Sequence, residues 1–155
     1  MTDVRIRPGR ADESARLSDL ALRSKAHWGY SDAFLEACRD ELSLAAADFG
    51  TDVVFVLERG HEIAGFYVLE PLSADDVELG FLFVEPAEMG RGCGKRLLAH
   101  ARDEAKRRGW RRIVVQSDPN AAAFYASCGA RVVGVAPSAS IPGRELPLLE
   151  IDLGP

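Results

Sequence analysis

Three glycines, Gly90, Gly92 and Gly94, precede a basic segment in the stretch "MGRGCGKRLL" at residues 89–98. Glycine lets another group approach the backbone closely, and it adopts positive φ without strain. The first amides of a helix have no partner within the helix and lie at its positive end, so they bind phosphate well. The stretch therefore predicts either a phosphate-binding turn at a helix start or a plain flexible turn.

The spacing of the glycines separates three kinds of phosphate loop. A Walker A loop has glycine where Met89 stands, and Ser or Thr where Arg96 follows Lys95. A Rossmann fingerprint places its third glycine one residue later than Gly94. A third pattern, Gln/Arg-x-x-Gly-x-Gly/Ala between a strand and a helix, matches 89–94 at every position but the first, which is Met89.

Positive charge is concentrated after these glycines. Nine lysines and arginines lie between Arg91 and Arg112, against only Asp103 and Glu104, whereas the whole chain has a net charge of -5. Such a run is either a solvated helix face or a patch for a multiply anionic ligand. Charge alone leaves both interpretations open.

Hydrophobic periodicity predicts the elements that must position these residues. The predicted strands are 4–7, two strands within 53–69 around a turn at 59–60, 77–84, 112–117, 130–136 and 146–153. The predicted helices are 11–25, 32–47, 94–108 and 119–128. This order describes a mixed α/β domain in which 77–84 and 112–117 are joined by a helical, parallel crossover. Strands beside such a crossover can splay apart and admit a ligand.

Capping residues support the helix boundaries. Asp12 is expected to cap the helix over 11–25, and Ser31 the helix over 32–47. Gly109 follows the helix over 94–108 as a terminating glycine. Asp118 and Pro119 are typical of an N-cap and a first-turn proline, and they predict the start of the helix over 119–128.

Two blocks of sequence together resemble the GNAT superfamily of N-acetyltransferases. "VELGFLFVEPAEMGRGCGKRLL" (77–98) is similar to its strand-loop-helix acyl-CoA motif, and "DPNAAAFYASCGA" (118–130) is similar to a short variant of its second motif. The resemblance covers most of the chain. It implies a single domain over 1–155 with the GNAT fold: a mixed sheet of about seven strands, about four helices and splayed central parallel strands.

The resemblance implies an acetyl-CoA-dependent N-acetyltransferase that transfers acetyl directly to a primary amine, without a metal. Tyr125 resembles the family's general acid, which protonates the leaving thiolate, and Glu78 occupies a strand position where a carboxylate acts as general base, directly or through water. The alternatives are a half-buried aromatic residue at Tyr125 and a solvated carboxylate at Glu78. The implied cofactor-binding residues are Leu82, Phe83, Val84, Met89, Gly90, Arg91, Gly92, Cys93, Gly94, Lys95, Asn120 and Phe124.

An aromatic segment and a loop are candidates for the acceptor site. His27, Trp28 and Tyr30 cluster between two predicted helices, where aromatic rings could hold an amine by cation–π contact and His27 could serve as base instead of Glu78. Arg144, in the loop over 137–145, could pair with an acceptor carboxylate. Loop packing and loop bracing are the structural alternatives. Cys93 is not expected to be a nucleophile, because the family that the sequence resembles forms no acyl-enzyme.

Composition limits the classes of function. The chain has 155 residues, 47% hydrophobic and 28% charged, as expected of one globular domain. Its negative charge argues against nucleic acid or an anionic membrane as partner, and its N-terminus lacks an apolar signal core, so we expect a cytoplasmic protein. The three cysteines, Cys38, Cys93 and Cys128, are expected to be reduced thiols. A homodimer is left open, as are two rival functions: an acyl-CoA-binding or sensory module of the same fold without significant turnover, and an ATP-binding protein.

Overall fold

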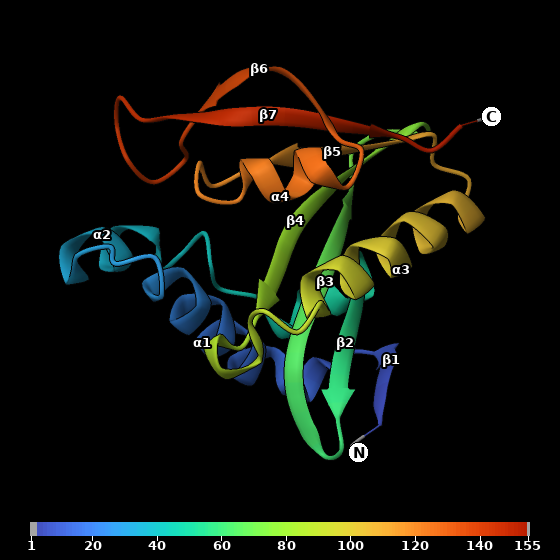
Figure 1. Ribbon diagram of the computed structural model, residues 1–155, viewed down its shortest axis with the longest axis horizontal. Helices are drawn as coiled ribbons and strands as arrows, with labels where there is room; N and C mark the ends of the chain where they lie inside the picture. The colour runs from blue at the N-terminus through green and yellow to red at the C-terminus, as the bar shows by residue number, and fades with distance from the viewer. Residues whose placement is uncertain (1–2, 155) are drawn as a thin grey trace.

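The computed structural model describes residues 3–154, which form one seven-stranded sheet (Figure 1). The strands are β1 (Val4–Pro8), β2 (Val53–Arg59), β3 (Glu62–Pro71), β4 (Asp76–Val84), β5 (Arg112–Gln116), β6 (Arg131–Pro137) and β7 (Glu145–Asp152). Their order across the sheet is β1-β2-β3-β4-β5-β7-β6, and every neighbouring pair is antiparallel except β4 with β5. The predicted mixed sheet with one parallel crossover is therefore confirmed.

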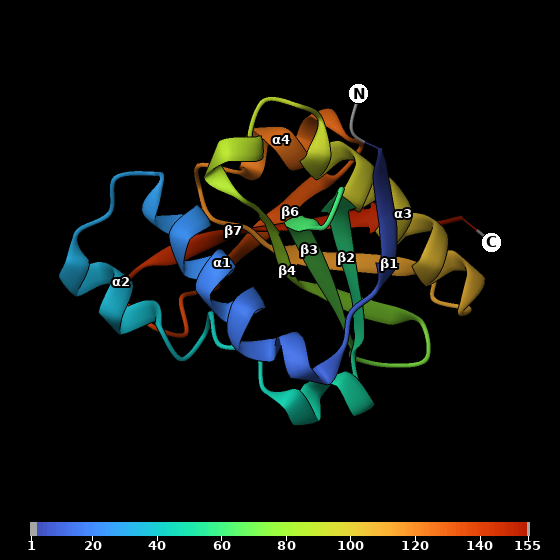
Figure 2. The same cartoon turned by 90° about the horizontal axis from the view of Figure 1, so that it is seen from below.

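Helices cover both faces of the sheet (Figure 2). The helices are α1 (Ser14–Ala26), α2 (Asp32–Cys38), α3 (Cys93–Arg107) and α4 (Ala122–Ser127), with 3-10 turns η1 (Ala11–Glu13), η2 (Ala46–Gly50) and η3 (Pro86–Glu88). One half of the core packs under α1 and α2, and the other under α3 and α4. Because both faces are covered, β3 is buried continuously from Ala64 to Leu69 instead of alternating.

Three helix boundaries differ from the sequence prediction. The helix predicted over 32–47 ends at Cys38, because the chain beyond it bonds to other elements: the amide of Leu44 donates to the Ser18 hydroxyl of α1 at 2.8 Å. Asp12 does not cap a helix, and α1 begins only at Ser14. The last helix begins at Ala122 rather than 119, because the chain from 118 to 121 forms a turn first.

Two predicted helix ends are confirmed. The Ser31 hydroxyl accepts the amide of Phe34 at 3.1 Å, which satisfies one of the free donors at the start of α2. Gly109 follows α3 with φ +96, a conformation that only glycine adopts without strain. No helix among residues 3–154 has the length and apolar character that crossing a membrane requires.

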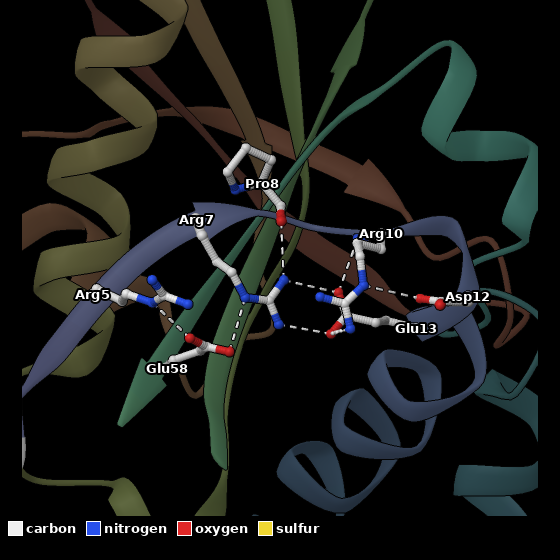
Figure 3. Close-up of polar contacts among 7 residues, drawn as sticks. All are labelled: Arg5, Arg7, Pro8, Arg10, Asp12, Glu13 and Glu58. Carbon is white, nitrogen blue, oxygen red and sulfur yellow. Dashed lines mark hydrogen bonds and ion pairs between the residues drawn. The ribbon is translucent and has the colours of Figure 1, made fainter. Parts of the chain in front are cut away.

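An arginine–glutamate network joins β1 and β2 to the start of α1 (Figure 3). Arg7 donates two hydrogen bonds to Glu13 at 3.0 and 2.8 Å, and its Nε donates to Glu58 at 2.9 Å. Glu13 is only 2% exposed, and its carboxylate also accepts the amide of Arg10 at 2.9 Å. The hydrogen bonds from Arg7 lower the pKa of Glu13 to about 2. The network fixes the entry to α1, one of the helices beside the cavity described below.

Candidate functional site

The site lies where β4 and β5 part. The two strands pair only from Asp76 to Glu78 on β4 and from Arg112 to Val114 on β5. Beyond Glu78, β4 pairs with β3 alone, and beyond Val114, β5 pairs with β7 alone. A cavity of about 560 Å³ occupies this opening. The predicted splaying of the central parallel strands is therefore confirmed.

The cavity gathers most of the residues predicted to bind the cofactor. The predicted residues that line it are Leu82, Phe83, Val84, Met89, Gly90, Gly92, Cys93, Gly94, Lys95, Asn120 and Phe124, together with Tyr125 and Trp28. Arg91, Glu78, His27, Tyr30 and Arg144 do not line it. The described structure thus brings the strand end, the glycine loop and the second motif together around one opening.

The glycines of the loop serve two different purposes. Gly90 and Gly92 have φ +81 and +80, and Gly92 is the N-cap of α3 without any side-chain cap. The first amides of α3 therefore remain available to an anion beside the cavity. Gly94 is different, because a Cβ there would lie 3.3 Å from the ring of Phe124. Its lack of a side chain lets α3 pack closely against α4.

Most of the basic run lies away from the cavity, and several of its arginines are held in ion pairs. Arg107 and Arg108 pair with Glu104, and Arg112 pairs with Asp76 and Glu150. Fifteen residues of α3 separate this end from the glycine loop by about 22 Å. Arg91 does not line the cavity and lies 3.8 Å from the carboxylate of Glu88, which does. Of the nine cations only Lys95 lines the cavity, so the run is mainly a solvated helix face.

Tyr125 presents a protonated hydroxyl to the cavity. The residue is 7% exposed and packs in the half of the core under α3 and α4. The Tyr125 hydroxyl has no hydrogen-bond partner among residues 3–154. Every fully buried side-chain nitrogen or oxygen in this range does have one, so the hydroxyl is not fully buried. The hydroxyl therefore remains open to the cavity that Tyr125 lines. Burial raises the pKa of Tyr125 well above its usual value, so the proton stays on the oxygen at neutral pH.

Asp118 is the centre of a polar cluster at one wall of the cavity. Its carboxylate accepts from the Tyr30 hydroxyl at 2.8 Å and from the Lys25 ammonium at 3.0 Å. The Tyr30 hydroxyl in turn accepts from Arg144 at 2.9 Å and from the side-chain amide of Asn120 at 3.0 Å. The cluster joins the α1–α2 segment, the β5–α4 turn and the β6–β7 loop. Sequence reasoning placed Tyr30 and Arg144 near the acceptor but gave Asp118 only a capping role.

Of the two remaining acceptor candidates, Trp28 lines the cavity and His27 does not. Trp28 is 48% exposed and lines the cavity. His27 is exposed and stacks edge-on against Trp28, with ring centroids 6.1 Å apart. Tyr30 stacks on Phe34 at 4.1 Å, and the Arg144 guanidinium lies 4.8 Å from the centre of the Phe34 ring. The aromatic segment is therefore partly a packing device, with Trp28 as its cavity-facing member.

Glu78 lies beside a second carboxylate that the sequence did not single out. Glu70 on β3 is its partner across the strand pair. Burial raises the pKa of Glu78. Burial and the neighbouring acids, Glu78 first among them, raise the pKa of Glu70 to about 7. Among residues 3–154, no group of three or more His, Cys, Asp or Glu side chains is arranged to hold a metal ion.

The family follows from a family model that matches residues 50–129, described as an acetyltransferase (GNAT) domain. The match covers more than half of the chain and includes β4, the glycine loop, α3 and α4. The chain belongs to the GNAT acetyltransferase family. A comparison with curated proteins gives no match.

Solved structures share the fold of this GNAT chain over nearly its whole length. A GCN5-related N-acetyltransferase from Rhodopseudomonas palustris matches with a TM-score of 0.79 and 22% identity, covering 98% of this chain and 97% of its own. The PaiA N-acetyltransferase from Thermoplasma acidophilum, solved with coenzyme A, matches with 0.75 and 18%, covering 97% and 99%. The YncA putative acetyltransferase from Salmonella typhimurium, solved with acetyl-CoA, matches with 0.71 and 22%, covering 99% and 95%.

Proposed function

We propose that this chain transfers the acetyl group of acetyl-CoA directly to a primary amine. The observation that carries the proposal is the cavity between β4 and β5, which has the glycine loop and the start of α3 at its edge and the Tyr125 hydroxyl in its wall. The solved relatives that contain coenzyme A or acetyl-CoA support this choice of cosubstrate.

The cofactor would be held mainly by backbone groups. Leu82, Phe83 and Val84 pair with β3 on one side only, so their other edge is free to bond the pantetheine arm. The amides from Gly90 to Lys95 would hold the pyrophosphate, with Lys95 adding positive charge. Met89, where the family pattern has Gln or Arg, adds no charge, but a backbone site does not depend on that side chain.

Two proton transfers complete the chemistry. The amine must lose a proton before its lone pair attacks the thioester carbonyl, and the departing thiolate must gain one. Tyr125 supplies the second proton, because its hydroxyl is protonated and open to the cavity. For the first, the sequence offers Glu78 and His27. Glu78 would act through water, since its side chain does not line the cavity.

The acceptor would enter from the side of Trp28 and the Asp118 cluster. Lys25, Asp118 and Asn120 line this end of the cavity, and Tyr30 and Arg144 stand behind them. In this arrangement Tyr30 and Arg144 shape the wall through Asp118, and Trp28 offers an aromatic face to a cationic amine.

An amine panel with detection of the released thiol tests the proposal. We expect free thiol to appear only when acetyl-CoA and a suitable amine are both present, and the product to carry one acetyl group by mass. Coenzyme A binding without thiol release from any amine would instead favour the module without turnover. Calorimetric binding of ATP without binding of coenzyme A would overturn the assignment of the cavity.

Changing Gly92 to Ala is expected to weaken coenzyme A binding by roughly tenfold. The residue has φ +80, and forcing a side chain into that conformation costs about 1–2 kcal/mol or displaces the loop amides. Gly109→Ala is a matched control, because its φ is +96 and nothing lies within 4 Å of a Cβ at either position. Calorimetry should show weaker coenzyme A binding only for Gly92→Ala. Equal effects in both variants would contradict the proposal that the loop amides hold the pyrophosphate.

A further inference from the structure

We propose that Glu70 of β3 takes the proton from the acceptor amine through water and that Glu78 acts on the reaction through Glu70. This inference rests on the proposed acetyl transfer and assigns its base to a residue that no sequence motif marks. It changes the role of Glu78 from proton acceptor to a positioning residue that sets the charge around Glu70. Three observations carry it: strand register, the close approach at Gly80 and the face of the sheet.

Strand register brings Glu70 to the opening of the sheet. Glu70 pairs with Glu78, and Glu78 is the last residue of β4 that also pairs with β5. The adjacent pair between β3 and β4 joins Leu69 to Leu79, and Leu79 lines the cavity. Glu70 therefore lies one strand away from the point where the cavity begins.

The carboxylate of Glu70 rests on Gly80, which lines the cavity. A Cβ built on Gly80 would collide with Oε2 of Glu70, so only glycine at this position permits the observed placement. The register shifts between Val68 and Leu69, and residue 80 is thereby left without a directly opposed partner on β3. The Glu70 carboxylate fills that space against the β4 backbone.

Glu70 lies on the face of the sheet from which we propose that the acceptor enters. Side chains alternate along a strand, so Glu70 lies on the same face of β3 as Phe66 and Val68. These two residues pack in the core half under α1 and α2. Ser24, Lys25 and Leu42, from the α1–α2 side, also line the cavity. Tyr125 packs in the opposite half of the core. The proton acceptor and the proton donor would thus stand on opposite faces of the sheet, with the thioester between them.

The surroundings of Glu70 suit a base at neutral pH. The charged groups that act on it are Glu78 on β4, Asp48 of η2 and Asp52 just after η2, and all are acids. Burial and these acids raise the pKa of Glu70 to about 7. A base of this strength is half ionised near neutral pH, where both its population and its affinity for the proton are useful.

The protons balance through one turnover. An ammonium acceptor gives one proton to Glu70 through water, since Glu70, like Glu78, does not line the cavity, and the resulting amine attacks the thioester carbonyl carbon. The carbon–sulfur bond breaks, and the sulfur takes the proton of Tyr125. The amide nitrogen then loses its second proton, which restores the Tyr125 hydroxyl. Glu70 finally releases its proton to water, so one proton leaves for each ammonium acetylated.

Two variants distinguish Glu70 from Glu78 by their pH profiles. Glu70→Gln is expected to lower kcat/KM about 100-fold and to remove the acidic limb of its pH profile. Glu78→Gln should retain that limb and shift it to lower pH, because removal of a neighbouring acid lowers the pKa of Glu70. The reverse pattern, with the limb lost in Glu78→Gln and retained in Glu70→Gln, would overturn the proposal. Glu36→Gln, on the exposed side of α2, is the control.

Two glycine substitutions test the placement of the Glu70 carboxylate without replacing either glutamate. Gly80→Ala displaces the far end of a flexible side chain, so the protein should fold while kcat falls at least tenfold and coenzyme A affinity stays the same. Gly134→Ala on β6 is the control, because nothing lies within 4 Å of a Cβ there. Equal kcat in the two variants would contradict a role for the Glu70 carboxylate at Gly80.

A direct titration separates failure of this inference from failure of the proposed function. Carbon NMR of labelled glutamates in the protein without cofactor should show one carboxyl that titrates near pH 7 and disappears in Glu70→Gln. An ordinary midpoint for Glu70 would overturn the inference even if the amine panel succeeds. A midpoint near 7 with no thiol release from any amine would overturn the acetyl transfer instead.

Discussion

Changing Tyr125 to Phe is expected to lower kcat for acetyl transfer by about 100-fold or more and to change coenzyme A affinity by no more than about twofold. The substitution removes only the hydroxyl, which has no hydrogen-bond partner among residues 3–154 to lose. The ring keeps its place in the core under α3 and α4. The expected loss therefore comes from the transition state, where the thiolate leaves without a proton. Steady-state kinetics and calorimetry measure the two quantities separately.

Tyr67→Phe is the matched control for this prediction. Tyr67 is fully buried in the same half of the core, and its hydroxyl makes a hydrogen bond of 2.7 Å with Nδ1 of His100. Its loss should reduce stability by about 1 kcal/mol and leave kcat nearly unchanged. If Tyr125→Phe retained the turnover of the wild type, the general-acid role would be excluded while the proposed acetyl transfer itself would stand.

Local patterns predicted the residues at the glycine-loop end of the cavity, where we propose that the cofactor binds. The glycine loop, the start of α3 and Tyr125 each depend on residues close together in the sequence, where turn and helix rules apply. The splay of β4 from β5 followed from element order alone, because a helical crossover predicts a parallel pair. The helix over 32–47 failed for the opposite reason. Its apolar periodicity continues past Cys38, but the backbone there bonds to Ser18, far away in sequence.

The proposed acceptor end of the cavity depends on contacts between distant segments. Asp118 was interpreted as a helix cap because Asp-Pro is a common helix start, yet its carboxylate binds Lys25 and Tyr30 from the other end of the chain. Glu70 carries no motif, and its place on Gly80 depends on a register shift between β3 and β4. Spacing within one strand does not specify the register with the next one, so these residues emerged only from the fold.

The site also depends on a network outside the cavity. Lys25 and Trp28 reach the cavity from the end of α1 and the turn after it, and the start of α1 is held to the sheet by Arg7, Glu13 and Glu58. A displacement of α1 would move Lys25 and Trp28 at the proposed acceptor end of the cavity. It would leave the backbone amides at the start of α3 unchanged. Stability of this network and acceptor binding are therefore expected to be coupled, and cofactor binding is not.

Glu13→Gln is expected to reduce the free energy of unfolding by about 3 kcal/mol at pH 7. The carboxylate is 2% exposed, and its loss leaves the Arg7 guanidinium, 15% exposed, with Glu58 as its remaining carboxylate. Breaking a buried pair by removing one partner costs about 3–5 kcal/mol, and the remaining partner reduces the effect. Asp12→Asn, which removes an exposed pair with Arg10, should cost at most about 1 kcal/mol.

The difference in free energy of unfolding between Glu13→Gln and the wild type should decrease as the pH falls. Hydrogen bonds from Arg7 lower the pKa of Glu13 from 4.5 to about 2 in the folded protein, so the folded state binds this proton less readily than the unfolded state. Its stabilisation is therefore complete above about pH 4.5 and is lost as the pH falls toward 2. Denaturant unfolding at pH 7, 4 and 3 should show the two proteins converging as acid is added. A difference that stayed constant down to pH 3 would mean that the ionised carboxylate is not what stabilises the start of α1.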